Sequence, residues 1–385
     1  MRANTVKTIY LDYNATTPIA PAVQEAMLPF LAEHYGNPSS GHALGRAAAE
    51  AVAEARERVA SLLGTTAEEI VFTGCGTEAN NLAIKGVAFR DDADGPGHFV
   101  ISAIEHPAIV APMRFLERLG HEVTVVGCSS QGVVDPHEVE AAIRPNTRLV
   151  SIMHANNETG AIQPIRQIAE ACRGRGVLCH TDAAQSTGKI PVRVGELGVD
   201  LLTVAGHKIY APKGVGCLYV RRGVVLEPVL HGAAHESGMR AGTENVPYLV
   251  GLGTAAATAE RNLSDAADHL AGLRDRLYAR LSAGLPGHTV NSGQVERLPN
   301  TLSINFPGVI GQELLDRAGQ ICASTGAACH SGNVERSATL AAMNVPEDQA
   351  RGTVRLSVGW FTEEENIDLA ASLLLDAWER LTASD

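Results

Sequence analysis

Short apolar runs alternate with longer amphipathic stretches through the first two thirds of the 385-residue chain. The runs have the length and composition of buried strands, and the stretches between them place apolar residues at helical spacing. This alternation predicts a mostly parallel sheet covered by helices on both faces. The predicted strands are Ile70–Thr73, Phe99–Ser102, Val123–Val126, Leu149–Met153, Val177–Thr181, Leu201–Val204 and Val215–Val220. The helices expected around them are Arg46–Leu63, Thr77–Phe89, His106–Leu119, Pro136–Ile143 and Ile165–Arg173.

The pattern changes near Tyr248, where a long helical stretch, Gly251–Leu285, begins. Shorter strand and helix patterns follow at Thr301–Phe306, Glu313–Arg317 and Val354–Val358, and a final helix starts at Thr362. We therefore expect a large α/β domain over residues 14–250. We expect a smaller α+β domain built from residues 1–13 with 251–385.

Composition excludes several classes of protein. The chain is 45% hydrophobic and 19% charged, as in a soluble globular protein, and it has no run of about 18 apolar residues that could span a membrane. Its net charge of −12 argues against binding to nucleic acid or to an anionic membrane. Met1–Leu11 lacks the apolar core of a signal peptide. Seven cysteines without a C-x-x-C pair indicate a reducing compartment, so we expect a cytoplasmic protein.

Lys208 lies just after the apolar run Leu201–Val204, between Gly206 and Gly214. Desolvation at the end of a buried strand lowers the pKa of a lysine and favours Schiff-base chemistry. Asp182 ends another apolar run. A lysine that binds pyridoxal 5'-phosphate (PLP) and an aspartate that holds its pyridine nitrogen are the two parts of a PLP site. Taken alone, Lys208 could instead be a surface lysine, and Asp182 could instead be a helix cap.

Gly74–Ala79 follows the first predicted strand and opens a helix, an arrangement that binds phosphate through free backbone N–H groups. The segment also matches the G-x-G-x-x-A dinucleotide fingerprint, so a dehydrogenase is a competing interpretation. That fingerprint requires an acidic residue at the end of the next strand, about 20 positions on. Asp94 precedes that strand and Glu105 comes too late, so phosphate binding is retained and NAD is not.

Other polar segments lie at predicted strand ends or in glycine-rich loops. His106 could stack on a planar ring, or simply begin a helix, and Asn156–Gly160 could bind a ligand or form a turn. His231 and His235 are four residues apart, but the glycines between and around them disfavour a helix, and no metal is expected. Cys329 lies in a loop of small residues beside a histidine, which suits either a reactive thiolate or a small buried side chain. The other cysteines are interpreted as structural.

Taken together, these segments resemble the cysteine desulfurases, PLP enzymes of the class V aminotransferase group, and the related selenocysteine lyases. The resemblance implies the PLP-dependent transferase fold of type I, with a mostly parallel seven-stranded sheet. The matching segments are Tyr10–Pro18, Tyr35–Ser40, Thr77–Asn81, Glu105–His106, Asn156–Gly160, His180–Gln185, Gly206–Lys208, Arg240–Thr243 and Gly326–Cys329.

The resemblance implies a role for individual residues. Lys208 would hold PLP and move the substrate Cα proton, His106 would assist that transfer, and Cys329 would attack the substrate sulfur. Arg355 and Asn157 would bind the substrate. The cofactor-binding residues would be Gly76, Thr77, His106, Asn157, Asp182, Gln185, His207, Lys208 and Thr243. Thr243 would act from the second subunit of a homodimer.

The activity implied by the resemblance is conversion of L-cysteine to L-alanine, with sulfur carried as a persulfide on Cys329 to a protein acceptor of unknown identity. Ala327–Ser331 is closer to the selenocysteine lyases, so release of selenium from L-selenocysteine is the alternative. Two departures are Ala205, where the family commonly has a serine, and the absence after the last predicted helix of the tail that docks an iron–sulfur scaffold. Another PLP transaminase or β-lyase, and a non-catalytic protein that kept the fold, are more remote alternatives.

Overall fold

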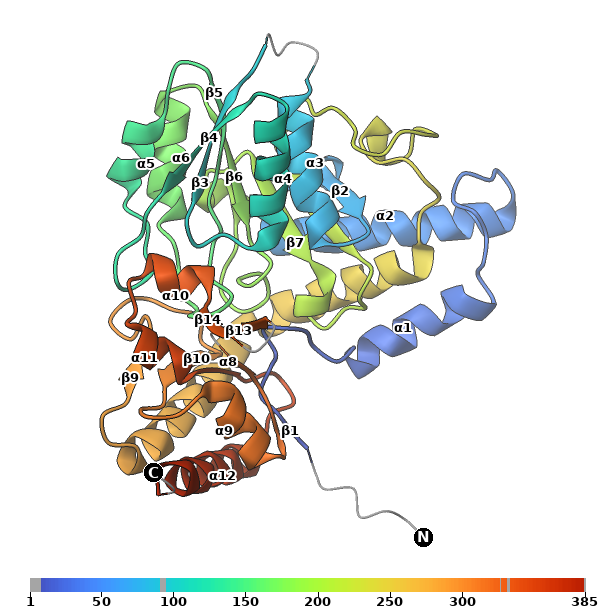
Figure 1. Cartoon of the computed structure of the whole chain (residues 1–385). Helices are drawn as coiled ribbons and strands as arrows, with labels where there is room; N and C mark the ends of the chain where they lie inside the picture. The colour runs from blue at the N-terminus through green and yellow to red at the C-terminus, as the bar shows by residue number, and fades with distance from the viewer. Residues whose placement is uncertain (1–7, 91–94, 326, 331–332, 384–385) are drawn as a thin grey trace.

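The computed structural model describes residues 8–90, 95–325, 327–330 and 333–383, and for residues 327–330 and 333–335 it describes the backbone only. Figure 1 shows two parts, a larger upper one built around a central sheet and a smaller lower one that contains the C-terminus. Among the described residues, no helix has the length and apolar character needed to cross a membrane.

The central sheet has seven strands in the order β2-β8-β7-β6-β5-β3-β4. The five from β7 to β4 pair in parallel, and β8 runs antiparallel to both of its neighbours. The predicted mostly parallel sheet is therefore confirmed. The strands are β2 (Ile70–Thr73), β3 (His98–Ser102), β4 (Glu122–Val126), β5 (Thr147–Ser151), β6 (Leu178–Asp182), β7 (Leu201–Ala205) and β8 (Gly216–Val220).

Helices cover both faces of the sheet (Figure 1), and apolar residues of both faces are buried beneath them. Neighbouring strand residues face opposite sides: Leu201 packs in a cluster with α3 and α4, whereas Leu202 packs in a cluster with α2, α6 and α8 (Val246–Gly284). This two-sided burial is why the strands have continuous apolar runs rather than alternating ones. These helices are α2 (Ala43–Leu63), α3 (Gly76–Ala88), α4 (Pro107–Arg118), α5 (Pro136–Ala142), α6 (Ile165–Gly174) and α7 (Val194–Leu197).

Helix α1 (Pro21–Ala32) is absent from the sequence-based prediction. It buries only Val23 and Met27, contains Pro29, and leaves Leu28 and Leu31 exposed. The segment therefore has little of the helical apolar periodicity on which the prediction depends.

A further hydrophobic cluster lies around a four-stranded sheet of order β12-β15-β10-β9. The 39-residue helix α8 contributes Leu273 to this cluster and Leu252 to the cluster that contains Leu202. The other elements here are β1 (Ile9–Tyr10), β9 (Thr289–Val290), β10 (Thr301–Asn305), α9 (Gly311–Ala318), β11 (Ile321–Cys322), β12 (Ser324–Thr325), α10 (Ala338–Ala342), α11 (Glu347–Arg351), β15 (Thr353–Ser357) and α12 (Glu364–Thr382). The proposed domain boundaries stay a prediction.

The glycine-rich segment that contains Cys329 was expected to be a loop, and that expectation is wrong for the backbone. β13 (Ala327–His330) pairs antiparallel with β14 (Asn333–Arg336), and Cys329 lies opposite Val334. Small residues carry no alternation of apolar and polar side chains, so the pattern held no signal for a strand. The Cys329 side chain lies outside the described residues.

Candidate active site

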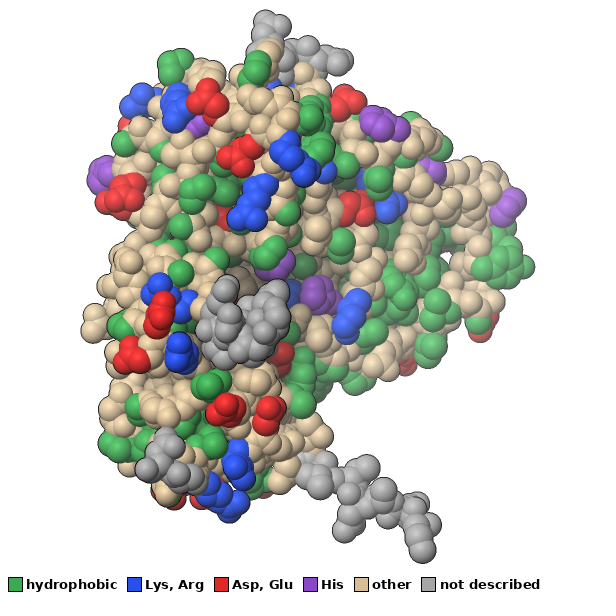
Figure 2. All heavy atoms as spheres, viewed as in Figure 1, with side chains coloured by type: hydrophobic (Ala, Val, Ile, Leu, Met, Phe, Trp, Pro, Cys, Tyr) green, Lys and Arg blue, Asp and Glu red, His purple; other side chains and the backbone are tan. Residues whose placement is uncertain are grey.

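A cavity of about 430 Å³ opens where β6 and β7 end and the segment from Tyr10 to Thr17 crosses over from β1. In Figure 2 a hollow beside histidine side chains marks the level where the two parts of the molecule meet. The cavity walls are formed by Asn14, Ala15, Cys75, Gly76, Thr77, Asn80, His106, Ala108, Met153, Ala155, Asn157, Asp182, Ala184, Gln185, Ala205, His207, Lys208 and Arg355. Ligands of open α/β sheets bind at this carboxyl edge, where the chain changes direction.

Lys208 ends a single 3₁₀ turn, Gly206–Lys208, directly after β7. Its Nζ donates to the backbone carbonyls of Asn14 and Ala15, at 2.7 Å for the latter. Burial and the nearby Arg355 guanidinium lower the pKa of Lys208 to about 8, against the opposing effect of the Asp182 and Asp12 carboxylates. A neutral amine is therefore accessible close to physiological pH, as nucleophilic and proton-transfer roles require.

Asp182 is the last residue of β6 and is 7% exposed. Asn80 Nδ2 donates to its Oδ2 at 2.8 Å, and the backbone N–H of Ala184 donates to its Oδ1 at 2.9 Å. The carboxylate is thus held from both sides at the wall of the cavity. It is suited to hold a protonated ring nitrogen of a ligand.

Helix α3 presents its N-terminus to the cavity through Gly76 and Thr77. The residue before it, Cys75, makes no side-chain hydrogen bond to the first turn, so the N–H groups there have no cap from that side chain. A Cβ on Gly76 would lie 3.0 Å from the Ala205 Cβ, which shows how closely the turn approaches β7. An uncapped helix N-terminus with close backbone approach is an anion site.

His207 and His106 contribute two imidazoles to the cavity. Burial, together with Lys208 and Lys213, lowers the pKa of His207 to about 4, and its Nδ1 is 3.1 Å from Thr16 Oγ1. Desolvation also lowers the pKa of His106, against the opposing effect of the Asp182 carboxylate, although His106 is an exposed residue at the cavity wall. His106 Nδ1 accepts from the backbone N–H of Ala108 at 3.1 Å. The neutral His106 ring therefore carries its proton on Nε2.

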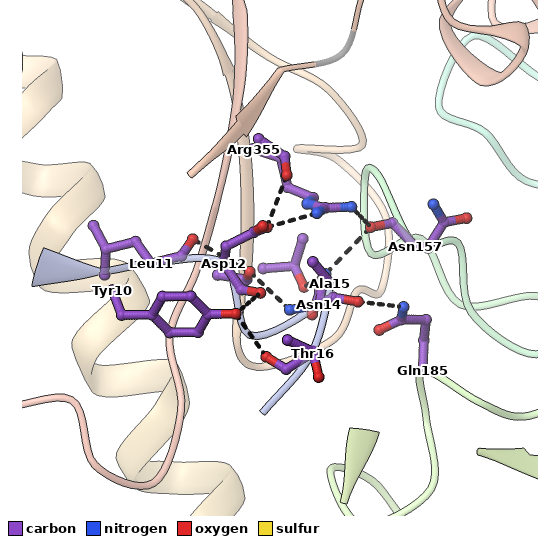
Figure 3. A network of polar contacts seen from close by, with 12 residues as sticks. Tyr10, Leu11, Asp12, Asn14, Ala15, Thr16, Asn157, Gln185 and Arg355 are labelled. Atoms are coloured by element: carbon purple, nitrogen blue, oxygen red, sulfur yellow. Dashed lines mark hydrogen bonds and ion pairs between the residues drawn. The ribbon is translucent and has the colours of Figure 1, made fainter. Parts of the chain in front are cut away.

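Arg355 on β15 brings a cation to the cavity from the smaller part of the molecule, and Figure 3 shows its contacts. One arm, NH1, donates to the backbone carbonyl of Asn157 at 2.9 Å. The other arm, NH2, pairs with Asp12 Oδ1 at 2.7 Å. Nε is buried and has no hydrogen-bond partner among the described residues. NH1 and NH2 each carry a second hydrogen, so the guanidinium can still donate to an acidic ligand in the cavity.

Asn14 connects these groups, although sequence reasoning assigned it no role. Its carbonyl oxygen accepts from Lys208 and from Gln185 Nε2, the latter at 3.0 Å. Its Nδ2 donates to the carbonyl of Asn157 and to Thr301 Oγ1 (Figure 3). The polar segment Asp12–Thr17 before the first predicted helix was the available signal, but polarity alone does not reveal a long-range contact.

Two buried ionisable groups beside the cavity were also missed. Lys189 donates to Gln185 Oε1 at 3.1 Å and to Asn14 Oδ1 at 3.4 Å, and burial lowers its pKa to about 7. Glu105 accepts from Ser102 Oγ and from the Met153 N–H, and burial raises its pKa to about 8. Both residues contact residues of the cavity wall without lining the cavity themselves. In the sequence each is only a charged residue among apolar neighbours, which does not reveal its contacts.

Two expected site residues are not brought to this cavity by the described part of the chain. Thr243 is exposed and lines a separate cavity of about 270 Å³ with Gly74, Glu236 and Arg240. The side chain of Cys329 lies outside the described residues. Among the described residues no cluster of histidine, cysteine or acidic side chains could hold a metal ion. The interpretation of the other cysteines as structural does not fit Cys322, which is exposed on β11.

Comparison with known proteins gives a consistent family. The model of the aminotransferase class-V family matches residues 9–369. A protein of Dictyoglomus turgidum named cysteine desulfurase IscS is 43% identical over 376 residues, which cover 97% of this chain and 95% of the relative. The solved structure of a NifS-like protein superimposes with a TM-score of 0.90 at 37% identity, covering 98% of this chain and 100% of the other. A structure described as SspA in complex with cysteine has a TM-score of 0.82 at 36% identity and covers 92% of this chain and 100% of the other.

Proposed function

Because the chain belongs to the class-V aminotransferase family, and within it to the cysteine desulfurases, we propose that it converts L-cysteine to L-alanine with PLP and transfers the sulfur as a persulfide on Cys329 to a protein acceptor. The observation that carries the proposal is the convergence of Lys208, Asp182 and Arg355 on one cavity from different elements. A catalytic amine, a carboxylate for a ring nitrogen and a cation for an acid group are what this reaction needs.

The cavity fits PLP. The uncapped first turn of α3 at Gly76 and Thr77, with His207 close by, suits the phosphate, and Asp182 suits the pyridine nitrogen. Gln185 Nε2, held on the Asn14 carbonyl, can donate its second hydrogen toward the ring oxygen, and His106 is placed on the cavity wall to cover the ring. When bound, PLP supplies an electron sink for negative charge at the substrate Cα.

The residues of this chain then share the proton transfers. Lys208, with a pKa of about 8, takes and returns the Cα proton at Nζ, and the carbonyls of Asn14 and Ala15 hold its protonated form. His106 remains neutral, because its pKa is lowered, and exchanges a proton at Nε2. Asp182, fixed by Asn80 and Ala184, keeps the opposite end of the site negatively charged.

Arg355 and Asn157 bind the substrate α-carboxylate in this proposal. The SspA structure, which is described as a complex with cysteine, supports an amino acid of this size. The Cys329 thiolate attacks the substrate sulfur, forming an S–S bond. The Cβ–S bond breaks, its electron pair stays on Cβ, and a proton is added there, so that alanine leaves and the sulfur remains on Cys329.

We further propose a homodimer in the cytoplasm, in which Thr243 reaches the phosphate end of the partner's cavity. Its exposure and its place outside the cavity of its own chain support a role in the neighbouring subunit. Leu28 and Leu31 on α1 are 62% and 58% exposed and supply apolar surface for an interface. The proposed division is a PLP-binding domain of residues 14–250 and a domain of residues 1–13 with 251–385 that carries Cys329.

The sequence Ala327–Ser331 favours selenocysteine lyase as a second candidate. A side-by-side assay of L-cysteine and L-selenocysteine, measuring alanine and the sulfur or selenium product, tests both. Turnover of cysteine that depends on Cys329 supports the desulfurase. Turnover confined to selenocysteine supports the lyase, and amino transfer that requires a keto acid would overturn both.

A further inference from the structure

Asp12 lies behind Arg355 and outside the cavity lining. Its Oδ1 is 2.7 Å from Arg355 NH2 and also accepts from Ser324 Oγ at 2.9 Å. Ser324 and Arg355 are paired residues of neighbouring strands β12 and β15, so the carboxylate spans a strand pair. Figure 3 shows Asp12 on one side of the guanidinium and Asn157 on the other.

The ion pair is largely buried, with the two side chains 10% and 18% exposed. A buried guanidinium without a counter-ion is costly, so Asp12 stabilises Arg355 while the site is empty. A bound α-carboxylate, however, has to share the Arg355 guanidinium with the permanent carboxylate of Asp12. Two negative groups on one guanidinium repel each other, and that repulsion weakens ligand binding.

We propose that Asp12 is a positioning residue that holds Arg355 toward the cavity and, through its charge, limits the affinity of the site for α-carboxylates. This inference rests on the proposed function of Arg355. A weaker hold on the α-carboxylate favours release of the amino-acid product after each turnover. Arg355 lines the cavity, and each of its terminal nitrogens carries a second hydrogen beyond the one given to Asn157 or Asp12, so these nitrogens are the donors left for the ligand.

Asp12→Asn separates charge from hydrogen bonding, because the amide oxygen can still accept from Arg355 and from Ser324. The test is binding of L-alanine and of L-alaninamide to the PLP-loaded enzyme, followed by the absorbance of the cofactor. Both ligands react through the same amine, and only L-alanine has a carboxylate. We expect Asp12→Asn to raise the preference for L-alanine over L-alaninamide roughly three- to thirty-fold. Any effect of the lost charge on Lys208 acts on both ligands through their shared amine and cancels in this ratio. KM for L-cysteine is expected to fall without a matching rise in kcat.

Two further variants control the experiment. Ser324→Ala removes the other hydrogen bond to Asp12 Oδ1 and keeps the charge, so its preference for L-alanine over L-alaninamide should not change. Asp12→Glu keeps a carboxylate and should also retain that preference, and it serves as the test if the asparagine variant does not fold. In that case, tighter binding of L-alanine by Asp12→Glu than by the unaltered enzyme contradicts the proposal.

An unchanged or reduced preference for L-alanine over L-alaninamide in Asp12→Asn would overturn the proposal. The two ligands bind without any sulfur chemistry. An enzyme that does not turn over cysteine but shows the selective gain for L-alanine would refute the proposed function and leave the role of Asp12 standing.

Discussion

Replacement of Glu105 by glutamine should stabilise the protein, and more strongly at pH 8 than at pH 5. Glu105 is buried, directly before His106, and burial raises the pKa of its carboxyl from 4.5 to about 8. The folded protein therefore keeps a proton on Glu105 that the unfolded chain loses above pH 4.5. As the pH rises from 4.5 toward 8, the unfolded state gains relative to the folded state, and stability is lost over that window.

The magnitude follows from the two pKa values. The linkage penalty is about 1 kcal/mol at pH 5 and about 4 kcal/mol at pH 8, so the effect of the substitution should differ by about 3 kcal/mol between these conditions. Glutamine has the size of the protonated carboxyl, and its oxygen can still accept from Ser102 Oγ and the Met153 N–H. Little packing energy is therefore at stake.

Urea unfolding of both proteins at pH 5 and pH 8, at equal protein concentration and cofactor loading, measures this difference. Glu50→Gln, the same chemical change at an exposed position of α2, is the matched control and should leave stability nearly unchanged at both pH values. An equal stability difference at the two pH values, or a variant less stable than the unaltered protein at pH 8, would refute the assignment of a buried neutral carboxyl.

Three other experiments test the site. Cys329→Ser should abolish sulfur release from L-cysteine while PLP absorbance is retained; undiminished release would exclude Cys329 as the nucleophile. Lys189 donates to Gln185 Oε1 and so orients that amide; Lys189→Met should release the amide and shift the pH midpoint of the cofactor absorbance. Lys213→Met, at an exposed position, is the control, and an identical shift in both variants would contradict the orienting role. If Thr243 acts across subunits, a mixed dimer of one Thr243→Ala chain and one Lys208→Ala chain has one site with neither substitution. It should recover about half of the activity of the unaltered dimer. Inactive mixed dimers would place Thr243 in its own subunit's site.

Local pattern was sufficient for the central sheet. Six of its seven strands are short and apolar because both of their faces are buried, and only β4, at the edge of the sheet, is partly exposed. The ends of all seven could be located within a few residues. Helix α1 escaped the same reasoning, since it buries little and leaves leucines exposed. The strand β13 escaped it because its small residues, Ala-Ala-Cys, carry no periodic signal.

The sequence by itself determined the parallel sheet, the lysine and the aspartate at its carboxyl edge and, through the resemblance, the family. These depend on residue type and on short spacing along the chain. Only the tertiary structure decided that Asp12 lies on Arg355, 343 positions away, and that Asn14 joins Lys208, Gln185 and Thr301. Such contacts depend on how two hydrophobic cores are packed side by side, which no local pattern records, and they set the charges that Lys208 and a bound carboxylate experience.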